Sequence, residues 1–494
     1  QPLGEQAFAV RRVLPLVSRS RNRVAVAAAV IAALGLGMWA GAAAGTPRAA
    51  TGNDWARFGW SPSRSSAPTF ATGITAANVR QLTRQQVQLD GTVDSSPIYL
   101  HGVQVGGTSH DVFFVTTTYG KTEAIDAASG KLLWSFTPPG YSSWAGSAQI
   151  TTATPVADPG RTSIYAASPG GQIYKLAVGD GHALWSATIT KLPSREKIAA
   201  SLNYANGRVI ATTGGYIGDA PPYQGHVAVI DPASGHVTAI WNSLCSDRRV
   251  LLSPDSCPAS DSAIWGRAGA VVDPVTGNLL VATGNAPWDG RTNWGDATLM
   301  LTPGATRLIG NYTPSNTADL NAGDVDLGST SPVYLSSNFV AQGGKDGRIR
   351  LLSMARLRGT APHKGGELQT VSTPSGTDLF TAPAVWHSQA TWMFAGDNGG
   401  TAGYVFKNGR LRIAWRNGTG GTSPVVAGGL LWVYSPGGGL SVYRPTSGAL
   451  VTRLDAGGGH WNSPIVVDGR VALPEGNAND HRTSGVLDIW RLPG

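Results

Sequence analysis

The sequence predicts an all-β fold, an eight-bladed β-propeller with four strands in each blade. The 494 residues include 65 glycines and 31 prolines, and only 14% are charged, a composition that divides a chain into many short strands and turns. One sequence pattern, in which a small residue and a proline precede an apolar strand, recurs along most of the chain. Beyond the first 50 residues no stretch sustains helical periodicity, so the repeated strands define the fold.

A typical copy of the repeat opens on the small residue and proline, runs through short apolar strands separated by turns, and closes near a glycine and a tryptophan. The first three copies end at Trp134, Trp185 and Trp241. The eight copies open at or near the following positions: Pro97, Pro155, Ile198, 268–273, Pro332, Pro383, Pro424 and Pro464. The mean spacing of about 52 residues fits a four-stranded blade. Eight blades are therefore predicted, and seven remain an alternative if the fourth and fifth copies are divided differently.

The last copy is short, since it ends at 488–490 with Asp-Ile-Trp. Residues 79–89 precede the first copy and form an additional strand-like segment. We expect this segment to supply the missing outermost strand by pairing with the chain end. Such a closure removes the free sheet edges that promote aggregation.

A basic leader precedes the repeats. Residues 1–50 contain six arginines and one acidic residue, followed within the leader by an apolar run over 24–44 that carries no charge. This pattern predicts export, either by a signal peptide cleaved after the alanines 42–44 or by an uncleaved membrane anchor of about 20 residues. The expected organisation is a leader over 1–50 and a propeller over 51–494. The propeller then lies outside the cytoplasm, as a periplasmic, secreted or membrane-anchored domain, and meets the membrane only through the leader.

The net charge of +8 lies mostly in the leader, so the propeller itself is almost neutral. A nearly neutral domain offers no basic surface for nucleic acid, which we therefore exclude as a partner. Cys245 and Cys257 are the two cysteines of the chain. In an oxidising compartment we expect them to form a disulfide that closes one local loop, and two free thiols are the alternative.

Residues 124–134, Ala-Ile-Asp-Ala-Ala-Ser-Gly-Lys-Leu-Leu-Trp, resemble the tryptophan-docking motif of quinoprotein-type propellers with PQQ-like repeats. In that family the tryptophan stacks against the glycine turn of a neighbouring motif. The family includes dehydrogenases that use pyrroloquinoline quinone (PQQ) and cofactor-free scaffolds such as the outer-membrane assembly lipoprotein. Fold alone does not distinguish these two functions.

The middle of the chain resembles the PQQ-dependent alcohol dehydrogenases. The segment 284–290, Gly-Asn-Ala-Pro-Trp-Asp-Gly, is similar to the one that supplies an asparagine ligand of calcium, which implies this role for Asn285. By the same resemblance, Trp265 forms the floor under the quinone and Lys345 touches a quinone carbonyl. Asp319 corresponds to the catalytic aspartate, which also binds calcium. Asp219 is the carboxylate nearest to the position of the third calcium ligand.

These assignments imply a site in which calcium polarises the quinone and a carboxylate accepts the proton of the substrate alcohol. The chain departs from the family in two ways: it has no vicinal cysteine pair, and Asp219 stands where the family has glutamate. Asp324 and Asp326 also lie close to Asp319. A purely structural role is the alternative for all of these residues, because Asn and Asp are common in turns.

Two functions therefore remain open. The first is an exported oxidoreductase that binds PQQ and Ca²⁺ and oxidises a small-molecule alcohol or sugar. The second is a cofactor-free scaffold that binds a protein or polysaccharide of the cell envelope. The chain lacks the Cys-x-x-Cys-His motif for covalent haem, so an oxidoreductase of this sequence would need a separate electron acceptor. The enzyme is favoured if the predicted residues converge around one pocket, and the scaffold is favoured if they lie apart on the rim.

Overall fold

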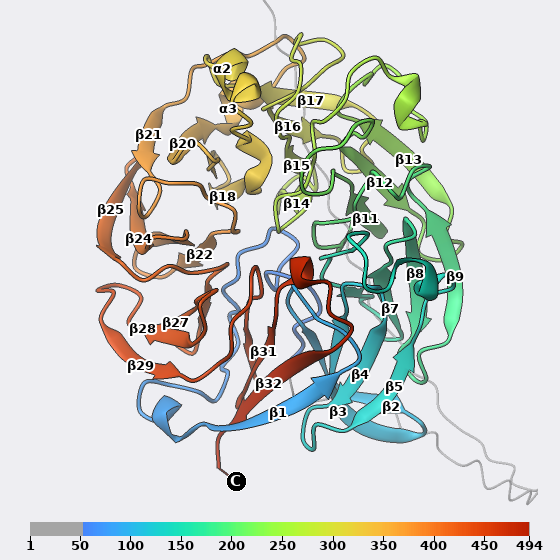
Figure 1. Cartoon of the computed structure of the whole chain (residues 1–494). Coiled ribbons are helices and arrows are strands. Elements are labelled where there is room, and N and C mark those ends of the chain that lie inside the picture. Colours follow the sequence, from blue (N-terminus) through green and yellow to red (C-terminus); the bar gives the residue numbers. More distant parts are fainter. Residues whose placement is uncertain (1–52, 494) are drawn as a thin grey trace, which may run out of the picture. The chain divides into compact units, whose positions relative to one another are not determined.

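The computed structural model describes residues 53–493, which form eight four-stranded antiparallel β-sheets. Figure 1 shows these sheets as blades around a ring, in the order in which they follow along the chain. The predicted eight-bladed propeller is confirmed, and the alternative of seven blades is wrong. The predicted leader lies outside the described residues.

Blades 1 to 4 each take four consecutive strands. Blade 1 contains β2 (Ile98–Val105), β3 (Thr108–Thr116), β4 (Thr122–Asp126) and β5 (Leu132–Phe136). Blade 2 contains β6 (Val156–Ala157), β7 (Ser163–Ala167), β8 (Gln172–Ala177) and β9 (Ala183–Thr188). Blade 3 contains β10 (Asn203–Ala205), β11 (Arg208–Thr212), β12 (His226–Ile230) and β13 (Val237–Asn242). Blade 4 contains β14 (Val271–Val272), β15 (Leu279–Ala282), β16 (Thr298–Leu301) and β17 (Leu308–Tyr312).

Blades 5 to 7 follow the same plan, and blade 8 differs. Blade 5 contains β18 (Val333–Ser336), β19 (Phe339–Gln342), β20 (Arg348–Ser353) and β21 (Gln369–Ser372). Blade 6 contains β22 (Ala384–His387), β23 (Thr391–Gly396), β24 (Thr401–Lys407) and β25 (Arg410–Asn417). Blade 7 contains β26 (Val425–Ala427), β27 (Leu430–Tyr434), β28 (Leu440–Tyr443) and β29 (Leu450–Leu454). Blade 8 contains β30 (Ile465–Val467), β31 (Arg470–Glu475), β32 (Gly485–Arg491) and, from the other end of the chain, β1 (Thr83–Leu89).

Short helices occur only in the connections of the described part of the chain. The α-helices are α1 (Tyr141–Trp144), α2 (Thr317–Ala322) and α3 (Met354–Leu357), and the 3-10 helices are η1 (Val79–Gln81), η2 (Pro254–Ser256), η3 (Leu327–Ser329) and η4 (Ala478–Asp480). None of the helices within 53–493 is long and apolar enough to cross a membrane.

The predicted ring closure is confirmed. Strand β1 pairs antiparallel with β32 over its whole length, from Thr83 opposite Arg491 to Leu89 opposite Gly485. The two ends of the propeller therefore share one sheet, which Figure 1 shows as the blue and red strands of a single blade.

The docking of tryptophan on glycine turns is confirmed between blades 1 and 2. The indole of Trp134 donates to the carbonyl of Val178 at 2.8 Å and covers Gly181, whose φ is +75°. A Cβ on Gly181 would lie 2.4 Å from the Trp134 ring, so only glycine allows this contact. Trp185 and Trp415 dock in the same way on Gly235 and Gly448 of the next blades.

The core lies between blades. For example, Phe114 of β3 and Ile164 of β7 belong to one buried apolar cluster that joins blades 1 and 2. Because each sheet buries its faces only against its neighbours, the whole ring is needed to complete the core.

The chain before β1 forms a strap across the inner strands. Backbone groups of residues 55–66 hydrogen-bond to five blades through Tyr99, Ala157, Val272, Val385 and Val426. Figure 1 shows this blue segment near the middle of the ring. Its Arg64 is 3% exposed and donates to the carbonyls of Phe58, Ser201 and Leu202.

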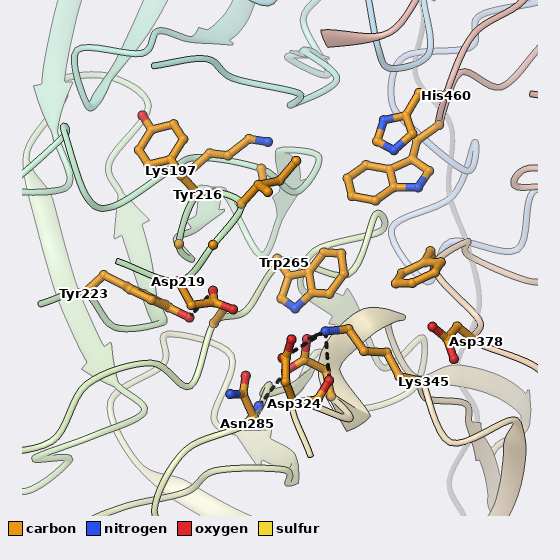
Figure 2. Close-up of a pocket in the computed structure, with 18 residues that line it drawn as sticks. Lys197, Tyr216, Asp219, Tyr223, Trp265, Asn285, Asp324, Lys345, Asp378 and His460 are labelled. Atoms are coloured by element: carbon orange, nitrogen blue, oxygen red, sulfur yellow. Dashed lines mark hydrogen bonds and ion pairs between the residues drawn. The ribbon is translucent and has the colours of Figure 1, made fainter. Parts of the chain in front are cut away.

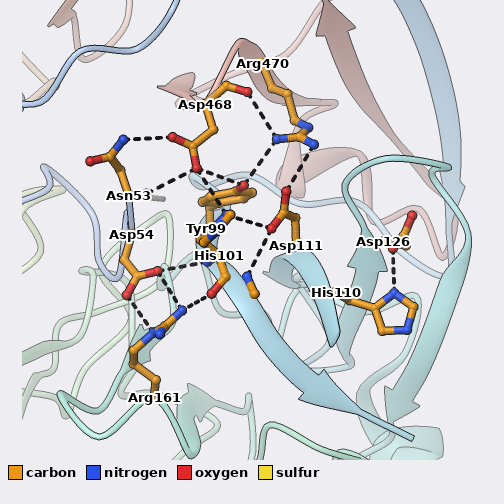
Figure 3. Close-up of polar contacts among 11 residues, drawn as sticks. Asn53, Asp54, Tyr99, His101, His110, Asp111, Asp126, Arg161, Asp468 and Arg470 are labelled. Atoms are coloured by element: carbon orange, nitrogen blue, oxygen red, sulfur yellow. Dashed lines mark hydrogen bonds and ion pairs between the residues drawn. The ribbon is translucent and has the colours of Figure 1, made fainter. Parts of the chain in front are cut away.

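A polar network fixes the beginning of the strap, as Figure 3 shows. The side-chain amide of Asn53 donates to Asp468 at 2.8 Å, and Asp54 pairs with Arg161 at 2.8 Å. His101 lies 2.8 Å from Asp111. The strap is thereby attached to blades 1, 2 and 8.

The predicted disulfide between Cys245 and Cys257 is present, with a Cα–Cα distance of 6.2 Å. It closes the loop that follows β13 of blade 3. The cysteines lie in a small buried cluster with Leu244 and Ala286.

Candidate functional site

A cavity of about 410 Å³ opens on one face of the ring, within the size range of small-molecule sites. Two kinds of loop line it. The loops that precede the first strand of a blade come from blades 3, 4, 5, 6 and 8, and the loops between second and third strands come from blades 3, 4 and 5. Because the repeat places these loops at equivalent positions, residues far apart in the sequence meet at one site.

Aromatic side chains form one part of the wall. The ring centroid of Trp265 lies 6.0 Å from that of Phe380 and 5.7 Å from that of Trp461. His460 stacks on Trp461 with a centroid distance of 4.0 Å. The planes are tilted toward one another, so the cavity offers flat apolar surfaces to a planar ligand.

Lys345 and two carboxylates form the floor, shown in the lower part of Figure 2. The Lys345 ammonium lies 2.7 Å from Asp326 and 3.0 Å from Asp324, and it also lies 5.8 Å from the Trp265 ring. Burial raises the pKa of Asp326, which is 4% exposed, while the Lys345 charge opposes this shift. Burial works against the charged form of Lys345, but its pairing with Asp326 raises its pKa overall.

The Gly-Asn pair at 284–285 holds Asp326 in place. The backbone N–H of Asn285 donates to Asp326 at 2.6 Å. A Cβ on Gly284 would lie 2.5 Å from the same carboxylate oxygen, so the glycine permits this approach. The side-chain amide of Asn285 makes no hydrogen bond within residues 53–493, and it lines the cavity.

Asp219 approaches from blade 3, where it accepts a hydrogen bond from the hydroxyl of Tyr223 at 2.7 Å. Burial, together with the charges of Asp219 and Asp326, raises the pKa of the carboxyl of Asp261 behind them. The floor therefore carries more negative charge than Lys345 neutralises.

The wall opposite the acidic floor carries a histidine paired with a buried aspartate, and a lysine. His460 Nδ1 donates to the buried carboxylate of Asp94 at 2.8 Å, and the backbone N–H groups of Trp461 and Ala478 donate to the same carboxylate. Lys197 lines the cavity on this side. Burial lowers the pKa of Lys197 to about 8.

Four of the five residues predicted for the cofactor site, Asp219, Trp265, Asn285 and Lys345, line this one cavity. The fifth, Asp319, does not. It is exposed on α2, and its backbone carbonyl accepts from Gly323 at 3.0 Å at the helix end. The chain turns back after this helix, so Asp324 and Asp326 reach the cavity in its place.

Sequence reasoning missed Lys197, Asp378, Phe380, His460 and Trp461. Phe380 and Trp461 each lie three residues before the proline that opens a copy of the repeat. Trp265 also precedes the first strand of its blade. This position in the repeat, rather than any local motif, was the available signal.

The residues present fit PQQ, and they fit calcium in part. PQQ is flat and carries several carboxylates, which suits the aromatic wall and the two lysines. For calcium, the oxygens of Asp219 and Asn285 lie on the same side of the cavity in Figure 2, and the acidic floor favours a cation. Among residues 53–493, however, no three His, Cys, Asp or Glu side chains gather at metal-binding distance. The ligand itself would have to complete a calcium shell.

Comparison with known proteins finds similarity both to an assembly factor and to quinone alcohol dehydrogenases. Residues 49–249 match the family model described as outer membrane protein assembly factor BamB. The chain is 24% identical, over 308 residues, to the dehydrogenase subunit of the quinone alcohol dehydrogenase of Gluconacetobacter polyoxogenes; the match covers 55% of this chain and 40% of the relative. The chain thus spans at most 40% of the curated relatives it matches.

Two solved structures show the fold. Quinohemoprotein alcohol dehydrogenase from Comamonas testosteroni superimposes with a TM-score of 0.63 at 14% identity, covering 89% of this chain and 81% of that chain. BamB from Moraxella catarrhalis gives a TM-score of 0.52 at 14% identity, covering 83% of this chain and 97% of that one. Residues 49–249 are thus similar in sequence to the family with PQQ-like repeats, and residues 53–493 have the eight-bladed fold seen in the quinohemoprotein alcohol dehydrogenase.

Proposed function

We propose that the central cavity binds PQQ together with Ca²⁺ and that the protein oxidises a small-molecule alcohol or sugar. The observation that carries this proposal is the convergence of Trp265, Lys345, Asn285 and Asp219 on one aromatic cavity. The sequence similarity to subunits of quinone alcohol dehydrogenases supports it. We further propose that the propeller is exported, which agrees with the disulfide within 245–257.

Each residue has a distinct role in this proposal. Trp265 offers its ring face to the cofactor, and Asp219 and Asn285 provide oxygens for the cation. PQQ, when bound, supplies the electron-accepting chemistry. Lys345 places a positive charge where negative charge develops, and Asp324 and Asp326 fix its position.

Asp326 replaces Asp319 as the proposed proton acceptor for the substrate hydroxyl. Its carboxylate lies beside Lys345 at the cavity, whereas Asp319 is exposed outside it. A carboxyl whose pKa is raised by burial is a stronger base than an exposed one, which suits this role.

Lys345→Gln is expected to weaken PQQ binding about 10- to 100-fold, because the substitution removes a charge-assisted contact and leaves Asp326 without its partner. Calorimetric titration of PQQ into the full-length protein with calcium measures this change. Lys407→Gln is the control, since Lys407 is exposed on β24 and lies outside the cavity.

The same titration tests the whole proposal. Wild-type protein should bind PQQ in calcium, and both EDTA and Asn285→Ala should weaken the binding. Absence of PQQ binding by wild-type protein with a normal circular dichroism spectrum would overturn the cofactor assignment.

The second candidate function is a cofactor-free scaffold that binds an envelope protein or polysaccharide. The match of residues 49–249 to the assembly-factor family supports it. A folded protein that does not bind PQQ and co-purifies with a defined envelope component would favour this function.

A further inference from the structure

Lys197 has no partner for its charge among the residues that the structure describes. It lies in the loop before β10, where its backbone pairs with that of Gly214 at 2.7 and 2.9 Å. Its side chain lines the cavity and is only 6% exposed. Within residues 53–493, its ammonium group makes no hydrogen bond and no ion pair. A buried charge without a partner is costly, and a ligand is one way to compensate it.

The charged groups around Lys197 do not compensate it. Arg267 is fully buried, donates to the carbonyls of Ala199 and Asp94, and lies 5.4 Å from the Trp461 ring. Asp94 is the acidic residue of this wall, and its carboxylate already accepts three hydrogen bonds, from His460, Trp461 and Ala478. Two cations thus face one anion, which leaves a surplus of positive charge.

The cavity is therefore polarised. Lys197 lies in the upper part of Figure 2, and the acidic floor around Lys345 lies in the lower part. The low pKa of Lys197, about 8, results from burial, and the Asp94 charge only partly opposes it. A ligand with a carboxylate at one end and an electron-rich, cation-binding group at the other would match both poles.

We propose that Lys197, with Arg267 behind it, binds a carboxylate of the ligand in the cavity. This inference rests on the proposed function, because the carboxylate can belong to PQQ or to an anionic substrate such as a hydroxy acid. Lys197 then determines that the cavity accepts anions at this wall and disfavours neutral molecules.

The test is titration of the full-length wild type, Lys197→Gln and the exposed-surface control Lys407→Gln with four probes: PQQ, its trimethyl ester, benzene-1,3,5-tricarboxylate and, for the PQQ-loaded protein, glycolate. Lys197→Gln is expected to weaken PQQ binding about 10- to 100-fold and to leave ester binding unchanged. Its thermal unfolding midpoint should equal or exceed that of the wild type, because an uncompensated buried charge is removed.

The dependence of PQQ affinity on pH gives a second readout. Only the protonated amine attracts a carboxylate, so wild-type affinity is expected to fall as the pH rises through about 8. Of the neighbouring groups, Asp94 and Arg267 keep their charges in this range, because the pKa of Asp94 is lowered and that of Arg267 is about 10. The decline above pH 8 should therefore be absent in Lys197→Gln.

The outcomes separate the two proposals. If PQQ binds and Lys197→Gln weakens it, the carboxylate is that of the quinone. If PQQ affinity is unchanged but the PQQ-loaded protein loses affinity for glycolate on substitution, the carboxylate is that of the substrate. If PQQ does not bind but the tricarboxylate binds in a Lys197-dependent way, the proposed function fails and this inference holds. Binding of every probe independently of Lys197, or of none, overturns the inference.

Discussion

Arg84→Met is expected to lower the free energy of unfolding by about 3–5 kcal/mol, the usual result of removing the partner of a buried charge, here that of Asp488. Arg84 lies on β1, the strand that closes the ring. Its guanidinium contacts both carboxylate oxygens of Asp488 at 2.8 Å and Glu475 at 2.7 Å. The side chain of Asp488 is fully buried.

The effect is expected to be large because Arg84→Met leaves the carboxylates of Asp488 and Glu475 without their cation. Burial, together with the neighbouring Glu475 carboxyl, already raises the pKa of Asp488 although Arg84 is present. Without the guanidinium, Asp488 and Glu475 face each other with no cation between them, and the folded state must protonate one of them or separate them. The strand that joins both ends of the propeller then pairs less tightly with β32.

Urea-induced unfolding followed by tryptophan fluorescence measures this loss as a lower midpoint. Arg412→Met is the matched control, because Arg412 is an exposed arginine on the outermost strand of blade 6. Equal midpoints for Arg84→Met and Arg412→Met would show that the ion pair does not hold the ring closed.

Trp134→Ala is expected to lower the free energy of unfolding by about 3–5 kcal/mol, as for other large aromatic residues truncated in a core. Its indole is 8% exposed, covers the glycine turn of blade 2 and donates to Val178. Truncation removes this packing and leaves a gap between two blades. The measurement is the same urea unfolding, and Leu132→Ala is the control, because Leu132 lies on the same strand but is 52% exposed.

A pair of glycine variants isolates the docking contact. Gly181 and Gly207 both have positive φ, +75° and +69°, so alanine strains the backbone at each. Only at Gly181 would the new Cβ collide with Trp134, whereas nothing lies within 4 Å of it at Gly207. Gly181→Ala should therefore destabilise more than Gly207→Ala, and equal losses would mean that docking contributes little.

The repeat could be predicted because every blade carries its own local signal. The proline openings and the Ser-Gly turns of the docking motif are short-range features, and they placed the blades and the pairing of both chain ends correctly. The strap over 55–66 could not be predicted, because it carries no local signal. Its sequence is that of an ordinary loop, and its hydrogen bonds go to five different blades.

In the candidate site, too, residues with a local sequence signal could be predicted and residues without one could not. Asn285, Trp265 and Lys345 belong to recognisable segments, and four of the five assigned residues line one cavity. Asp319 was assigned by resemblance to the dehydrogenase sequence, but that resemblance does not reveal that α2 turns the chain so that Asp324 and Asp326 reach the cavity. His460 and Lys197 are 263 positions apart in the numbering, and no local pattern connects them.

The sequence by itself therefore determined the fold class, the number of blades, the way in which the ring closes and the disulfide, since strand, turn and docking signals act over a few residues and repeat. Only the tertiary structure decided which carboxylates face Lys345, how the strap crosses the inner strands, and that Lys197 lines the cavity without a counter-ion. Those features depend on loops from five blades meeting at one place, and the charge balance of such a site is a property of the assembled ring.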